Sequence, residues 1–145
     1  MDEIKINYTA VFVAALAMFF IGWGWYSAFG NAWMSYTGMT MEMAEQMSGF
    51  DFAKSYGGSF VAYLLLFYCM AHVSHAFQVK DVKGGAMSGF WSWLGFTATP
   101  IFVSTAYQAK PFGLFLIDAG YWLIGMTAGG VILAVMKKKE TAPAA

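Results

Sequence analysis

The sequence predicts an all-α integral membrane protein, a four-helix bundle with a short amphipathic interfacial helix between its first and second spanning helices. Three observations lead to this class. The chain of 145 residues is 59% hydrophobic and only 11% charged, whereas soluble domains carry about 25% charged residues. Aromatic residues make up 19% of the chain, and Trp and Tyr are enriched at membrane interfaces. Long stretches without formal charge alternate with short polar segments, as expected for spanning helices and their connections.

The first expected span covers residues 8–29, which are predominantly apolar. At about 1.5 Å per residue, this stretch crosses a hydrocarbon core of about 30 Å. A secretory signal peptide is the alternative, because Ala15-Leu16-Ala17 resembles a cleavage site. The apolar stretch continues beyond that site, which favours a retained span. Trp33, beyond the end of this span, is expected to be an interfacial anchor.

The polar segment 30–54 is expected to contain the interfacial helix. Thr40 is a suitable N-cap, and Glu42 and Glu45 lie near the positive end of the helix dipole. Apolar side chains recur at helical spacing, which is typical of a helix lying on a bilayer surface. They are Met39, Met43, Met47 and Phe50. An ordinary extramembrane helix packed on the end of the bundle is the alternative.

The other expected spans are residues 58–77, 86–108 and 112–136. Pro100 interrupts the third span and predicts a kink, because proline lacks the N–H of the helical hydrogen bond. Thr97 and Thr99 are close enough in sequence to satisfy the freed backbone. The short connections at 78–85 and 109–111 make the helices that they join antiparallel neighbours.

Residues 1–136 form a single expected domain. Residues 137–145 follow it as a basic stop and a disordered cytoplasmic tail. With four spans, both termini lie on one side of the membrane. That side holds six lysines and the opposite side two, so the positive-inside rule places both termini in the cytoplasm. The six are Lys5, Lys80, Lys83, Lys137, Lys138 and Lys139, and the two are Lys54 and Lys110.

Asp118 is the acidic residue well inside an expected span, about 9 Å from its outer end by helical rise. An unpaired carboxylate at this depth costs a few kcal/mol, which predicts hydrogen-bonding partners. Counting from the outer ends places residues 23–26 and 99–103 at the same level. The candidate binding-site residues are Asp118, Tyr26, Trp23, Trp25, Tyr121, Trp122, Thr99 and Ser104.

Two interpretations of Asp118 stay open. In the functional one, it is a protonatable carboxylate, or the counter-ion of a cationic ligand in an aromatic pocket. In the structural one, it ties the fourth helix to the first by hydrogen bonds. The sequence leaves its protonation state open.

Other features narrow the function. Cys69, His72 and His75 are metal-ligating residue types, but their spacing on one helix is a weak signal, and we predict neither a metal nor another cofactor. A chain with zero net charge and no arginine lacks the basic face that nucleic acids require. Nucleotide loops and nucleophile motifs are missing from the sequence, which weakens an enzymatic interpretation. Glycine pairs at 85/89 and 125/129 predict close helix contacts, either within the bundle or between protomers.

A resemblance supports this architecture. The segment Gly24-Trp25-Tyr26-Ser27-Ala28-Phe29-Gly30-Asn31-Ala32-Trp33, followed by Gly38-Met39-Thr40, resembles the opening signature of the domain-of-unknown-function 1761 family. Residues 84–89, 95–97 and 117–122 also resemble that family. Its members are small bacterial proteins with four predicted membrane helices. The resemblance implies this architecture and a bacterial inner-membrane location, and it implies no activity.

The resulting functional hypothesis is a non-enzymatic membrane protein that binds a small lipophilic or cationic ligand, or that assembles with itself or a partner membrane protein. Its site lies in the outer half of the bundle around Asp118 and Tyr26. The alternative is an oligomeric proton-coupled or cation-coupled transporter or channel that uses Asp118. A membrane enzyme with Asp118 and Tyr26 as acid and base is a third, weaker hypothesis.

Overall fold

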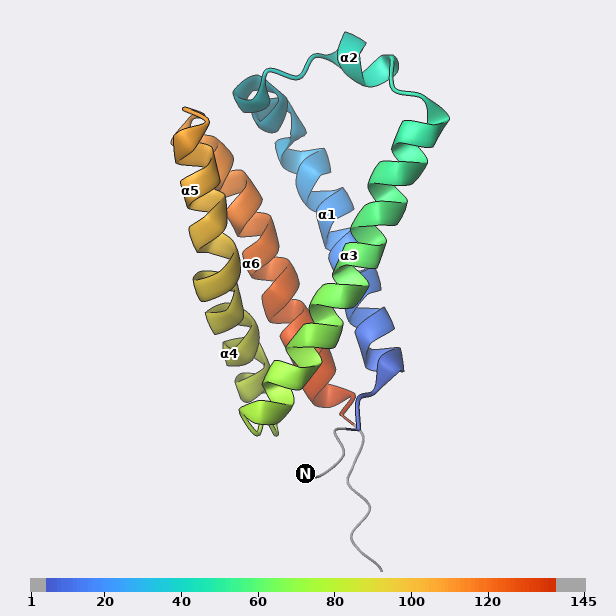
Figure 1. Cartoon of the computed structure of the whole chain (residues 1–145), viewed down its shortest axis with the longest axis vertical. Helices are drawn as coiled ribbons and strands as arrows, with labels where there is room; N and C mark the ends of the chain where they lie inside the picture. Colours follow the sequence, from blue (N-terminus) through green and yellow to red (C-terminus); the bar gives the residue numbers. More distant parts are fainter. Residues whose placement is uncertain (1–4, 138–145) are drawn as a thin grey trace, which may run out of the picture.

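The computed structural model describes residues 5–137, which form helices and their connections without a strand (Figure 1). In chain order the elements are α1 (Tyr8–Thr37), α2 (Met41–Glu45), α3 (Gly49–Ala76), α4 (Val82–Trp93), the π-helical segment η1 (Leu94–Ala98), α5 (Thr99–Tyr107) and α6 (Phe112–Val135). Among the described residues, three helices are long and apolar enough to cross a membrane, namely α1, α3 and α6. The fold is therefore all-helical and compatible with a membrane.

Local capping determines where the long helices begin and end. The Asn7 side chain accepts hydrogen bonds from the backbone N–H groups of Thr9 and Ala10 at the start of α1. Gly38 ends α1 in the left-handed region, with φ 82°, which glycine adopts without steric cost. Ser48 and Asp51 form a reciprocal capping box that starts α3.

These caps make α1 and α3 longer than the spans expected at 8–29 and 58–77, and they shorten the segment between them. Helix α2 has five residues, and Thr40 is its N-cap, as expected. Met47 lies in the connection and Phe50 in α3, so the expected row of apolar side chains does not lie on one helix. The Ser48 capping box is the reason, because it starts a new helix within that pattern.

The expected third span is helical without a break over residues 82–107, as α4, η1 and α5 follow one another directly. The widened π-helical turn comes immediately before Pro100, at the position where the proline removes a backbone donor. The Thr99 hydroxyl donates to the Gly95 carbonyl at 2.8 Å. Thr97 instead donates to the Met126 sulfur on α6 at 3.3 Å.

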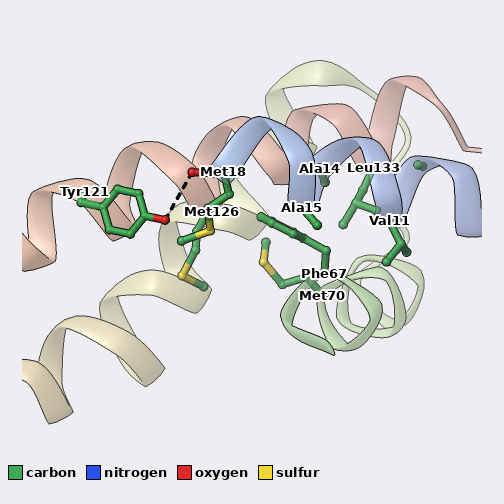
Figure 2. Packing of buried hydrophobic residues seen from close by; sticks show 10 residues of the cluster. Val11, Ala14, Ala15, Met18, Phe67, Met70, Tyr121, Met126 and Leu133 are labelled. Atoms are coloured by element: carbon green, nitrogen blue, oxygen red, sulfur yellow. Dashed lines mark hydrogen bonds between the residues drawn. The ribbon is translucent and has the colours of Figure 1, made fainter. Parts of the chain in front are cut away.

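The tightest packing lies in the half of the bundle near the chain termini. Phe67 of α3 is fully buried among side chains of α1 and α6 (Figure 2). Glycines allow this close approach: Gly125 lies against Met18, and Gly129 lies against the Phe67 ring. On the other side of α6, the glycine pair of α4 contacts the α6 backbone, where a Cβ would not fit. Gly85 lies against Gly130, and Gly89 lies against Met126.

Both glycine pairs therefore make their contacts within this chain. Toward α2 the bundle opens, because α3 diverges from α1 and α6 (Figure 1). Residues 49–58 of α3 are all exposed. The bundle thus has a tightly packed half around Phe67 and an open half toward α2.

Candidate functional site

Asp118 on α6 accepts two hydrogen bonds from aromatic side chains of α1. The Tyr26 hydroxyl donates to Asp118 Oδ1 at 2.8 Å, and the Trp33 indole N–H donates to the same oxygen at 3.1 Å. Tyr26 and Trp33 are seven residues apart, about two helical turns, so they share one face of α1. The rings also contact each other edge to face. One carboxylate oxygen is thus held by two donors from a neighbouring helix.

Further hydrogen bonds join α1 to residues of α6 that precede and follow Asp118. The Trp25 indole N–H donates to the Ile117 carbonyl at 3.0 Å, and the Tyr121 hydroxyl donates to the Met18 carbonyl at 3.3 Å (Figure 2). Gly22 lies against the Tyr121 ring. These contacts fix the register of α1 on α6, which places Asp118 opposite its two donors.

A cavity of about 640 Å³ lies beside the carboxylate, and we call it the Asp118 cavity. Its residues come from α1, α5, α6 and the α5–α6 connection. They are Tyr26, Trp33, Thr37, Pro100, Ile101, Ser104, Thr105, Gln108, Lys110, Leu114, Asp118 and Trp122. The cavity combines two charged side chains with hydroxyl, amide and aromatic groups. The Lys110 ammonium donates to the Thr37 carbonyl at 3.0 Å, at the end of α1.

A second cavity, of about 680 Å³, lies on the other side of the same two rings, and we call it the α1–α3 cleft. Its lining carries no formally charged side chain. The residues are Phe19, Gly22, Trp23, Tyr26, Ser27, Gly30, Asn31, Trp33, Met34, Met39, Tyr56, Ser59, Tyr63 and Tyr121. Tyr26 and Trp33 line both cavities and form the wall between them.

The structure brings together Asp118 and three of the residues predicted to accompany it. The expected hydrogen bond from Tyr26 is present. Trp122 and Ser104 line the Asp118 cavity, and the Ser104 hydroxyl accepts a hydrogen bond from Gln108 at 2.8 Å. Residues 23–26 were expected at the level of Asp118, and Tyr26 lies beside it.

The remaining predicted residues lie elsewhere. Trp25 donates to the Ile117 carbonyl beside Asp118. Trp23 is 72% exposed and lines the α1–α3 cleft, as does the buried Tyr121. Thr99 is exposed and bonds within its own helix.

Trp33 is a hydrogen-bond partner of Asp118 that was not among the residues expected from the sequence. We expected it to be an interfacial anchor, because the apolar stretch appeared to end before it. Helix α1 instead continues to Thr37, which keeps Trp33 on the α6 side of the bundle. Its seven-residue spacing from Tyr26 was the available signal.

The metal-ligating residue types on α3 do not converge. His72 Nδ1 lies 3.0 Å from the Tyr68 carbonyl of its own helix, and Cys69 is exposed. Within residues 5–137, no group of three or more His, Cys, Asp and Glu side chains is placed to hold a metal ion.

Long apolar helices, with a carboxylate held between two of them by aromatic donors, define an all-helical protein compatible with a membrane. The chain belongs to the DUF1761 family, described as proteins of unknown function, because the family's sequence model matches residues 9–134. This match confirms the resemblance noted from the Trp-Tyr and glycine motifs. Searches of curated proteins and of solved structures returned no match.

Proposed function

We propose that this protein is a four-span integral protein of a bacterial inner membrane, with both termini in the cytoplasm. Helices α1, α3 and α6 supply three spans, and the continuous helical segment 82–107 supplies the fourth. The excess of lysine at the terminal end supports this orientation. Helix α2 then lies at the outer surface, where the exposed Met41 and Met43 reach the interface.

We further propose that the protein is a non-enzymatic binding protein whose Asp118 cavity takes a small lipophilic cation. The observation that carries this proposal is the geometry of Asp118. Both donors from α1 bind Oδ1, and the carboxylate also lines a cavity with three aromatic rings, Tyr26, Trp33 and Trp122. A carboxylate with aromatic faces around it attracts an organic cation by charge and by cation–π contact.

The charge of Asp118 distinguishes a role in ligand binding from a purely structural role, in which Asp118 only links α6 to α1 by hydrogen bonds. A tie between α1 and α6 needs one oxygen acceptor, which an asparagine side chain supplies equally well. Carboxylates inside membrane bundles often serve as the counter-ion of a ligand. Lys110 is the other charged side chain of the cavity, and its ammonium bonds to the end of α1. We therefore propose that a cationic ligand is the charged partner of Asp118.

The test uses tetraphenylphosphonium, a lipophilic cation, and protein reconstituted in nanodiscs. We expect Asp118→Asn to weaken binding at least tenfold, about 1.4 kcal/mol, while the variant keeps its fold. Asp81→Asn is the matched control, because Asp81 caps α4 outside the cavity and asparagine caps equally well. Equal affinity of wild type and Asp118→Asn would contradict the proposal.

A second candidate is proton-coupled or cation-coupled transport by an oligomer. It is favoured by the wall that Tyr26 and Trp33 form between two cavities, because release of their bonds to Asp118 would connect the cavities. The oligomer would use surfaces other than the glycine pairs, which are engaged within the chain. Proton-dependent flux in proteoliposomes that Asp118→Asn abolishes would favour this candidate over simple binding.

A further inference from the structure

We propose that the α1–α3 cleft is a lipid site that takes one acyl chain of a bilayer phospholipid. This inference rests on the proposed membrane location. The cleft is separate from the proposed cation site, and its proposed ligand is an uncharged acyl chain instead of a cation. The lining of the cleft, its opening and its size all match such a ligand.

The lining presents hydrocarbon surface, although it contains several polar side chains. The Tyr26 hydroxyl donates to Asp118, on the far side of the wall. The Tyr121 hydroxyl donates to the Met18 carbonyl, and the Ser27 hydroxyl donates to the Trp23 carbonyl at 2.6 Å. These three hydroxyl groups are engaged within the protein, and the rest of the lining is uncharged and includes the side chains of Phe19, Trp23 and Tyr56. An uncharged chain without hydrogen-bonding groups matches such a surface.

Helices α1 and α3 diverge toward α2 (Figure 1), and the cleft is lined by residues of these diverging halves. Trp23 of α1 and Tyr56 of α3 line it and are 72% and 57% exposed. In the proposed membrane, both helices cross the hydrocarbon core, so the cleft faces lipid tails. An acyl chain therefore enters without leaving an apolar medium.

The size of the cleft and the polar group at one end also match a phospholipid. About 680 Å³ is within the range of about 300–1,000 Å³ that is typical of small-molecule sites. Asn31 lies farther toward α2 than Tyr26, and it is exposed. Its amide is placed at the headgroup end, where a phospholipid carries ester and phosphate oxygens.

Two glycines of α1 provide a matched test. A Cβ added at Gly30 or at Gly24 meets nothing within 4 Å, so both positions accept a larger side chain. Gly30 lines the cleft, whereas Gly24 does not belong to its lining. Gly30→Leu therefore fills the cleft, and Gly24→Leu changes the same helix outside it.

The experiment counts phosphatidylethanolamine bound per protein by native mass spectrometry, after exchange from nanodiscs into a delipidating detergent. We expect one retained lipid for wild type and for Gly24→Leu, and at least a fivefold loss for Gly30→Leu. Equal retention by Gly30→Leu and wild type would overturn the proposal. So would conversion of a dimer to a monomer by Gly30→Leu, because a second copy would then be the occupant.

Failure of this proposal is distinguishable from failure of the cation site. If alkaline carbonate extracted the protein from membranes, the proposed membrane location would be contradicted, and both binding proposals would fail with it. Tetraphenylphosphonium binding by Gly30→Leu reports on the Asp118 cavity alone, and we expect it to match wild type. Lost lipid with retained cation binding assigns the two ligands to the two cavities.

Discussion

The two cavities on either side of α1 have nearly the same volume and share Tyr26 and Trp33, yet their chemistry differs. The Asp118 cavity carries a carboxylate, an ammonium, an amide and hydroxyl groups. The α1–α3 cleft has an uncharged lining rich in aromatic rings. One pair of side chains therefore separates a compartment with charged side chains from an uncharged one.

The difference shows how hydrogen bonding orients an aromatic wall. Tyr26 and Trp33 both direct their polar atoms at Asp118 on α6. The same two side chains also line the α1–α3 cleft. Because their bonds to Asp118 hold both rings in place, substitutions at Asp118 and in the wall are the strongest way to challenge the comparison.

The largest expected effect is that of Asp118→Leu. It leaves the Tyr26 hydroxyl and the Trp33 N–H without an acceptor, and each unpaired buried donor costs about 1–3 kcal/mol. We expect a loss of about 2–6 kcal/mol in the free energy of unfolding, measured by SDS titration in mixed micelles. Asp118→Asn keeps a neutral acceptor for both donors and is therefore expected to lose less stability than Asp118→Leu. Equal losses for the two variants would show that these bonds do not hold the wall.

A smaller effect separates a charged acceptor from a neutral one. Trp33→Phe removes a bond to a carboxylate, whereas Trp25→Phe removes a bond to the Ile117 carbonyl. Bonds to charged groups contribute about 1.5–3 kcal/mol and neutral ones about 0.5–1.5. We therefore expect Trp33→Phe to destabilise the protein more in the same titration. A larger loss for Trp25→Phe would contradict a charged Asp118.

The smallest effect concerns how closely α1 packs against Tyr121 of α6. Gly22 lies 3.1 Å, measured from a Cβ placed on it, from the Tyr121 ring, whereas a Cβ at Gly24 is in open space. Alanine in a helix interior is more favourable than glycine by about 0.5–1 kcal/mol. We expect Gly24→Ala to raise the melting temperature in detergent, and Gly22→Ala to leave it unchanged or lower it. The opposite order would mean that α1 and Tyr121 are not in close contact.

The sequence predicted the helical class and included Tyr26 among several candidate partners of Asp118, because charge-free lengths and depth along a helix can both be counted along the chain. It did not predict the role of Trp33, because the end of α1 depends on Gly38 rather than on hydropathy. The α1–α3 cleft was also not predicted. Its lining combines residues of α1, α3 and α6 that are far apart in the sequence.

The central claim is that one aromatic wall separates two sites with opposite ligand chemistry. The most direct test measures tetraphenylphosphonium affinity and retained phospholipid for wild type, Asp118→Asn and Gly30→Leu. The account predicts that Asp118→Asn loses the cation and keeps the lipid, and that Gly30→Leu keeps the cation and loses the lipid. If either variant lost both ligands, or if both variants kept both, the two cavities would not be separate sites.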